Sequence, residues 1–221
     1  MGTSTENFLS SRDRILLSAK GLFAKNGYEG TSTVAIARQA GTSESQLMKH
    51  FGSKQGLLFA ILEQGWSAIL HRAYALSSVA DRSPQTVVDI LDSVFVELEH
   101  DPEMKSILVL ESRRARRDNP AGTPGEGYLQ FSTLLENILK DLKQRGILRA
   151  EVSVTATAAA LFGVIDGMLF EQVVSARSGR KLRFEAEESR GVIDAVISGL
   201  VTEPVTSAAN QTEHPSWTHG H

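Results

Sequence analysis

The chain contains 221 residues, 41% of them hydrophobic, which is enough for one large domain or a small domain joined to a larger one. It has no cysteine, so disulfides and thiolate chemistry are excluded, and a reducing cytoplasm is a fitting compartment. The formal net charge is -3, but residues 1–56 carry seven Lys/Arg and four Asp/Glu, whereas the remainder carries 16 and 22. This asymmetry predicts an N-terminal part that faces a polyanion, attached to an acidic body.

The first segment, residues 1–10, has neither the basic start nor the apolar run of a signal peptide, and we expect it to be flexible. No apolar stretch reaches the roughly 18 residues needed to cross a bilayer. We therefore expect a cytoplasmic protein with no membrane partner, no cofactor and no metal site.

Nearly every segment shows helical periodicity, and no run of alternating β-branched residues is bounded by turn signals. The predicted fold class is therefore all-α, with about nine helices in total. The first helix is predicted over Ser11–Asn26, where Asn26-Gly27 supplies a left-handed stop. Its apolar stripe consists of Ile15, Leu16, Ala19, Leu22 and Phe23.

Residues 32–51 have the pattern of a helix-turn-helix, which needs a short supporting helix, a tight turn and a second helix with a polar outer face. Gly41 stands at the turn, after a helix with Ile36, Ala37 and Ala40 on its buried side. Ser43 and Gln46 have the S-x-x-Q spacing of a capping box that opens the second helix. We therefore predict a DNA-binding unit over residues 11–56.

The second helix of this motif should direct Leu47 and Phe51 inward, because they are four residues apart. Its outer positions are then the candidate DNA contacts: Ser45, Gln46, Met48, Lys49 and His50. Gln46 can bond adenine and Met48 can contact a thymine methyl. Lys49 can bind phosphate or guanine, and His50 can donate to a phosphate. The alternative, a merely solvated polar face, is the better explanation of such a helix viewed alone.

Ser53-Lys54 begins the next helix with a cation at the end where the helix dipole disfavours one. A DNA phosphate bound by Lys54 and by free backbone N–H groups would resolve that conflict. Hydroxyls near the starts of the two motif helices are further candidate DNA contacts, on Ser32, Thr33, Thr42 and Ser43. Some of these hydroxyls could instead be N-caps, and Ser32 can serve as both.

Two later helices have clear starts, because Ser83-Pro84 and Asp101-Pro102 each place a capping side chain before a proline. We expect helices over Pro84–Glu99 and residues 102–117, an exposed loop over residues 118–127, and a further helix near residues 128–145. The run of arginines at residues 113–117 is better explained as a solvated helix end than as a second nucleic-acid site.

The segment over residues 153–178 is apolar on more than one face, and we expect it to be buried on several sides. Small residues at Ala156, Ala160, Gly163 and Gly167 would let another helix approach closely. The last helix, residues 184–201, should pack beside it, with Val192 and Val196 among its apolar positions.

These two helices could supply half of a four-helix dimer interface, and a purely intramolecular core is the alternative. Beyond them, residues 204–221 turn polar and are predicted to form a disordered tail.

Residues 19–58 resemble, without a gap, the DNA-binding domain of the tetracycline-repressor (TetR) family. The matching residues are Phe23, Gly27, Tyr28, Ile36, Ala37, Ala40, Gly41, Leu47, Phe51 and Lys54. Three positions depart from the family pattern. Met48 replaces the usual tyrosine, Val34 replaces a polar residue, and Glu44 adds a negative charge that favours its helix dipole or accepts from cytosine.

The resemblance implies an all-helical homodimer in which residues 57–203 bind a small effector and dimerise through the last two long helices. Its pocket would lie among the middle helices, where mostly apolar side chains could line it: Trp66, Phe95, Met104, Leu108, Glu111, Phe131, Leu135, Phe162, Ile165 and Asp166. Asp166 interrupts an otherwise apolar helix, so it could orient a ligand or only pair with an arginine.

The function that these features predict is a homodimeric repressor that releases a palindromic DNA operator when a small, largely apolar effector binds. One alternative is a DNA-binding regulator without an effector. An enzyme is disfavoured, because the sequence has no metalloprotease, phosphate-loop or nucleophile-elbow motif. A non-specific architectural DNA binder is disfavoured by the acidic body.

Overall fold

The computed structural model describes residues 9–79, 81–118, 125–181, 184 and 186–202, without the side chains of residues 111–118 and 186. Within this part the chain forms nine α-helices and no β-strand, which confirms the predicted all-α class. The helices are α1 (Ser11–Asn26), α2 (Thr33–Gln39), α3 (Glu44–Phe51), α4 (Lys54–Ser77), α5 (Pro84–Glu99), α6 (Pro102–Asp118), α7 (Glu126–Gln144), α8 (Val154–Ser178) and α9 (Ala186–Leu200).

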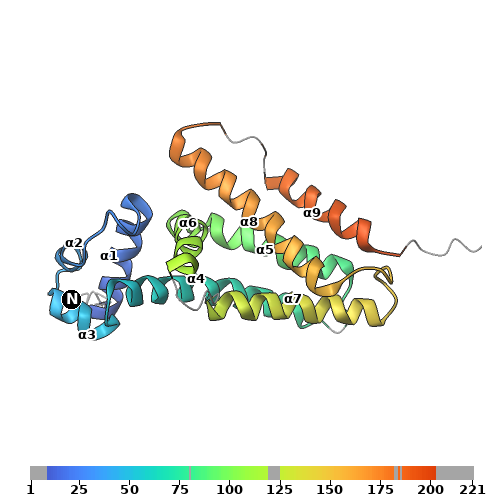
Figure 1. Cartoon of the computed structure of the whole chain (residues 1–221), viewed down its shortest axis with the longest axis horizontal. Helices are drawn as coiled ribbons and strands as arrows, with labels where there is room; N and C mark the ends of the chain where they lie inside the picture. Colours follow the sequence, from blue (N-terminus) through green and yellow to red (C-terminus); the bar gives the residue numbers. More distant parts are fainter. Residues whose placement is uncertain (1–8, 80, 119–124, 182–183, 185, 203–221) are drawn as a thin grey trace, which may run out of the picture.

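Helices α1 to α3 gather at one end of the molecule, and the remaining helices form an elongated body (Figure 1). The two parts are joined by α4, which starts beside α3 and then packs against α5, α6 and α7. Because α4 is continuous from Lys54 to Ser77, the domain boundary expected at residues 56–57 falls inside its first turn. The body therefore shares a rigid helix with the N-terminal unit.

The helix starts follow the local capping chemistry. Ser83 and Thr86 form a capping box at α5, and the carboxylate of Asp101 accepts from the N–H of Met104 at 3.0 Å at the start of α6. Both starts at proline are confirmed. By contrast, α7 begins two residues earlier than expected, at Glu126. Most of the loop before α7, the N-terminal residues 1–8 and the tail from residue 203 lie outside the described residues.

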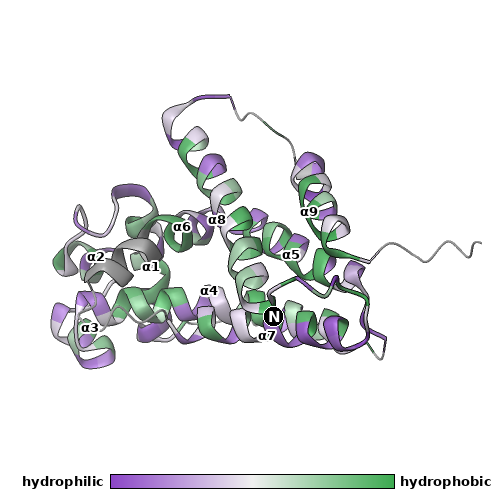
Figure 2. Ribbon diagram, turned by 45° about the vertical axis from the view of Figure 1, so that its right-hand side comes forward, coloured by the Kyte–Doolittle hydropathy of each residue, from purple (hydrophilic) through white to green (hydrophobic). Residues whose placement is uncertain are grey.

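The predicted burial of α8 on several sides is not what the single chain shows. Its buried residues, such as Leu161, Ile165 and Leu169, lie on one face that packs against α6 and α7. Figure 2 shows that most of this helix is nevertheless hydrophobic or neutral. By length and composition α8 is also apolar enough to cross a membrane, contrary to the expectation that no segment is, and 22% of its most apolar window is buried.

The last helix was expected to pack beside α8, but α9 contacts α8 only slightly and packs chiefly against α5. Arg190 of α9 donates to Asp92 at 2.6 Å and to Asp89 at 2.8 Å, both on α5. Burial alone would raise the pKa of Asp89, but hydrogen bonds from Arg190 and Gln85 and the charge of Arg190 together hold that pKa below its ordinary value. These hydrogen bonds hold one face of α9 against α5. The opposite face of α9 stays uncovered, because α8 contacts α9 only slightly.

Candidate functional site

The turn between α2 and α3 has the geometry that a helix-turn-helix requires. Gly41 has a φ of 61°, a left-handed conformation that favours glycine, and the N–H of Thr42 closes the turn by donating to the Ala37 carbonyl at 3.0 Å. Ile36 and Leu47 are fully buried on the facing sides of the two helices. The small side chains and the glycine therefore perform the roles predicted from the sequence.

A cation on α1 holds this turn in place. The side chain of Arg14 donates through Nε to the carbonyl of Ala40, which ends α2, at 3.0 Å, and through Nη1 to the carbonyl of Leu9 at 3.1 Å. The hydroxyls of Ser11 and Thr42 lie 3.5 Å apart at the same place. The carbonyl at a helix end lacks an intrahelical partner, so Arg14 satisfies it and fixes the end of α2, where the turn begins, relative to α1.

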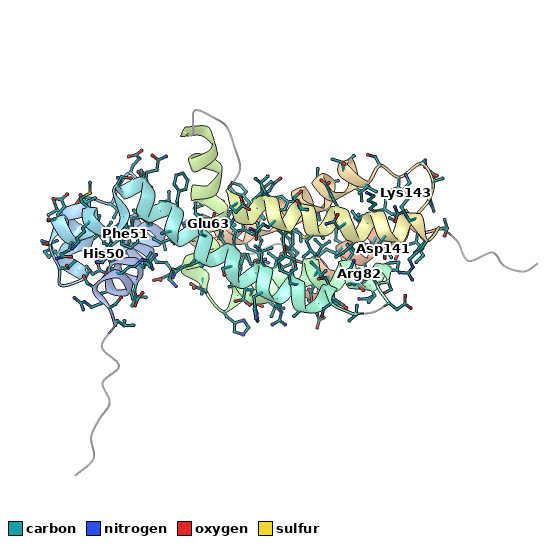
Figure 3. All side chains as sticks on the ribbon, turned by 90° about the horizontal axis from the view of Figure 1, so that it is seen from below. His50, Phe51, Glu63, Arg82, Asp141 and Lys143 are labelled. Atoms are coloured by element: carbon teal, nitrogen blue, oxygen red, sulfur yellow. The ribbon has the colours of Figure 1, made fainter. Side chains whose placement is uncertain are left out.

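The outer face of α3 is open to solvent. Leu47 is completely buried, whereas all five predicted DNA contacts of this helix are exposed: Ser45, Gln46, Met48, Lys49 and His50. Figure 3 shows His50 at the end of the molecule that is remote from Asp141 and Lys143. Met48 keeps 43% of its surface exposed, so an apolar side chain projects from an otherwise polar helix.

The hydroxyls at the helix starts act as N-caps. Ser43 accepts from the N–H of Gln46 at 3.2 Å, and Ser32 accepts from the N–H of Ala35 at 3.1 Å. The side chain of Gln46 remains exposed, and the described contacts show only the Ser43 half of the predicted capping box. Each hydroxyl still has its own proton to donate, so capping and a phosphate contact are compatible.

Glu44 finds a partner within the motif. The hydroxyl of Thr33, at the start of α2, donates to the carboxylate of Glu44, at the start of α3. This bond uses the proton with which Thr33 was expected to contact DNA. It also gives the carboxylate a donor at the helix end where a negative charge is favourable, which agrees with the helix-dipole interpretation of Glu44.

Lys54 is placed differently from the free phosphate clamp that the sequence led us to expect. Its ammonium donates to the carbonyls of Tyr28 and Thr31, each at 3.0 Å, and lies 4.1 Å from the centre of the Tyr28 ring. Carbonyl oxygens and the aromatic face thus offset the unfavourable cation at the start of α4. At most one ammonium proton is left for a phosphate.

Arg12 is a candidate DNA contact that the sequence reasoning missed. Its exposed guanidinium lies 5.3 Å from the centre of the Phe51 ring, at the C-terminal end of α3. From the sequence, Arg12 was simply a residue outside the apolar stripe of the first helix. The packing of α1 against α3 places it beside Phe51, whose ring also neighbours that of His50.

The residues expected to line an effector pocket separate into distinct groups. Trp66, Phe131 and Phe162 come together in an aromatic cluster, with ring centres 5.9 to 6.4 Å apart, and Tyr128, which was not predicted, joins it 4.6 Å from Phe162. The buried core includes Phe95, Met104, Leu108, Leu135 and Ile165, while Asp166 is half-buried. The side chain of Glu111 lies outside the described residues.

Met104 lines a cavity of about 290 Å³ between α1 and the body, together with Leu16, Lys20 and Gln64 among others. This cavity lies at the junction of the two parts of the chain. The effector pocket was instead expected among the middle helices, without a wall formed by α1.

The expected dimer residues form an uncovered surface in the single chain. Ala156, Ala160, Gly163 and Gly167 are all exposed, and a Cβ added at either glycine would meet no atom within 4 Å. On α9, Val192 is 44% exposed and Val196 is half-buried. The sequence predicted that another helix approaches these small residues closely, but within the described part of the single chain they face open space.

The family model described as bacterial regulatory proteins, tetR family, matches residues 15–61. The HTH-type transcriptional regulator YvkB of Bacillus subtilis is 30% identical over 137 residues, covering 62% of this chain and 69% of that protein. The regulator UidR of Escherichia coli K12 is 26% identical over 197 residues, covering 87% and 93%. The structure of FadR from Bacillus subtilis in complex with stearoyl-CoA superposes with a TM-score of 0.72 at 21% identity, covering 85% and 98%.

Proposed function

The chain belongs to the TetR family of bacterial regulatory proteins and is a helix-turn-helix transcriptional regulator, and we propose that it is a homodimeric repressor of a palindromic operator. The observation that supports this most directly is α3: its inner residue Leu47 is fully buried, while its outer face is exposed and polar at one end of the molecule. A rigidly held helix with a free outer face is what entry into a major groove requires.

The proposed contacts divide by chemistry. Gln46 and Met48 read base edges, because an amide and an apolar chain match adenine and a thymine methyl, whereas the ammonium of Lys49 binds a phosphate. His50, with Ser45, binds the phosphate backbone, and we add Arg12 because it borders the same face. The capping hydroxyls of Ser32 and Ser43, with Thr42, contribute at the edges, and Lys54 contributes its remaining proton.

A second copy of the chain would cover the open face of α8 and α9. This face unites an apolar helix with a stripe of small residues, and both helices stay uncovered there in the single chain. A two-fold dimer would place two copies of α3 about one DNA turn apart. It would also explain why so apolar a helix is buried on only one side.

A small, largely apolar effector in the body would shift the spacing of the two α3 helices and release the operator. The stearoyl-CoA complex of FadR shows that a protein of this fold accommodates a ligand with a long apolar acyl chain. The aromatic cluster around Trp66 is the proposed recognition element. A regulator without an effector is the alternative. Since the relatives are transcriptional regulators, we assign a cytoplasmic role on DNA and no catalytic role.

The test is selection of bound sequences from random duplex DNA with the purified full-length protein. We expect a palindromic motif whose binding weakens steeply with salt, because phosphate contacts release counterions. If no sequence is enriched, the proposal fails. Native mass spectrometry of the same sample checks for a dimer and for a co-purified apolar ligand.

A further inference from the structure

Arg177 links the last turn of α8 directly to the DNA-binding unit. Its Nη2 donates to the carbonyl oxygen of Ala24 on α1 at 2.5 Å and to the hydroxyl oxygen of Ser106 on α6 at 2.8 Å. Arg177 and Ala24 are 153 residues apart in the sequence, so this contact exists only through the fold. One guanidinium therefore joins three helices, of which α1 belongs to the N-terminal unit and α8 to the proposed dimer face.

The acceptor on α1 explains why the contact matters. The last four carbonyls of a helix have no intrahelical donor, and in α1 the N–H of Gly27 serves only the carbonyl of Phe23. Arg177 supplies the donor for Ala24, and its positive charge is favourable at a helix C-terminus. Arg177 therefore bonds the backbone at the end of α1 and not a mobile side chain. In turn, Arg14 of α1 bonds the end of α2 and so holds the helix-turn-helix.

The surroundings of Arg177 are not densely filled. A cavity of about 390 Å³ lies at this junction, and its walls include Gly21 of α1, Lys105 of α6 and Val173 of α8. A separate ion pair, Lys20 to Asp101 at 2.7 Å, joins α1 to the start of α6 but does not involve α8. Beside this cavity, the bifurcated, charge-assisted donor of Arg177 provides a directional contact between α1 and α8.

We propose that Arg177 is a positioning residue for operator binding: it sets the angle between the helix-turn-helix and α8, and hence the separation of the two recognition helices in the dimer. This inference rests on the proposed function, because it needs a dimer that binds two half-sites. Figure 1 shows the geometry, with the C-terminal end of α8 next to α6 on the side of the body nearest α1.

The experiment measures the spacing preference of the full-length protein. Duplexes carrying the selected palindrome are lengthened or shortened at the centre one base pair at a time, and a duplex with a single half-site is included. For Arg177→Ala we expect roughly tenfold weaker binding at the optimal spacing, a flatter dependence on spacing, and unchanged binding to the single half-site. The matched control is Arg180→Ala, which removes the same charge from an arginine that pairs with Glu171 near the same helix end.

Two results would overturn the proposal: a spacing profile identical to that of the unmodified protein, or equal losses on full-site and half-site duplexes, which indicate a structural role only. If Arg177→Ala lowers stability, Ser106→Ala decides, because it removes the hydroxyl on α6 that orients the guanidinium toward Ala24 and so weakens the bond to α1. At unchanged melting temperature it must flatten the spacing profile. Failure of the proposed function would be seen earlier, since no palindrome would be selected.

Discussion

The ammonium of Lys54 lies 4.1 Å from the centre of the Tyr28 ring and donates to the Tyr28 carbonyl at 3.0 Å. With a second bond to the Thr31 carbonyl, it ties the first residue of α4 to the segment that precedes α2. A lysine in the family-like position thus closes the DNA-binding unit from within. Its main contribution should therefore be to stability.

Lys54→Met removes the charge and both hydrogen bonds but keeps much of the aliphatic chain. We expect the free energy of unfolding to fall by about 1.5–3 kcal/mol, the range for hydrogen bonds to a charged group. Urea denaturation measures this change. A variant of unchanged stability whose operator binding depends less on salt would instead identify Lys54 as a phosphate contact.

Much of the helix-turn-helix could be predicted from the sequence, because its signals are local. Gly41, the caps at Ser32 and Ser43, and the inward Leu47 each depend on neighbours a few residues away. The contacts that fix the motif were not predictable in this way. Arg14 reaches Ala40 only because α1 folds against the turn, and Arg177 reaches Ala24 from the other end of the chain.

The packing of α8 and α9 shows a second limit. Helical periodicity identifies which residues are apolar, but it does not identify which helix covers them, so α9 was assigned to α8 although it packs on α5. The ion pairs of Arg190 with Asp89 and Asp92, which accompany that choice, have no local sequence signal. Likewise, the contact of Tyr128 on α7 with Phe162 on α8 joins two different helices and has no local sequence signal.

Gln46 and Lys49 are expected to separate base reading from phosphate binding. Gln46→Ala should relax the preference for adenine at one operator position at a cost of about 1–3 kcal/mol. Lys49→Ala should lower affinity more evenly across sequences and reduce the salt slope by about 1 if it contacts a phosphate. Fluorescence anisotropy with single-base operator variants measures both effects.

The control for Lys49→Ala is Lys140→Ala, an exposed lysine on α7 in the body. It changes the net charge equally but should leave operator affinity unchanged. Because Gln46 and Lys49 are exposed, their variants should keep the melting temperature of the unmodified protein. Unaltered binding by both variants would refute the assignment of α3 as the reading helix.

Gly163→Glu tests the dimer face. A side chain at Gly163 meets no neighbour within the chain, so the fold should tolerate it, but a charge buried between two copies of α8 should prevent their association. Sedimentation velocity should show a monomer with the helical circular dichroism of the unmodified protein. Thr133→Glu, on an exposed position of α7, introduces the same charge and should remain dimeric. A dimeric Gly163→Glu protein would place the interface elsewhere.

Gly127 allows α7 to approach α4 closely at the aromatic cluster. A Cβ at this buried position would lie 2.2 Å from the Cβ and 2.5 Å from the Cγ of Trp66, atoms near the backbone that cannot move aside. Gly127→Ala should therefore lower the free energy of unfolding by about 1–3 kcal/mol, the usual cost of overpacking. Urea denaturation measures this cost.

The comparison is Gly65→Ala, at the contact of α4 with α6. There the added Cβ would approach the Sδ of Met104 at 2.6 Å and a terminal methyl of Leu108 at 2.9 Å, which are the ends of flexible side chains. Since a methionine can change rotamer and the alanine gains helix propensity, Gly65→Ala should be the milder of the two changes. The prediction is contradicted if Gly127→Ala leaves the free energy of unfolding unchanged and Gly65→Ala lowers it strongly. That result would mean that α7 can shift at the aromatic cluster, whereas the contact between α4 and α6 is rigid.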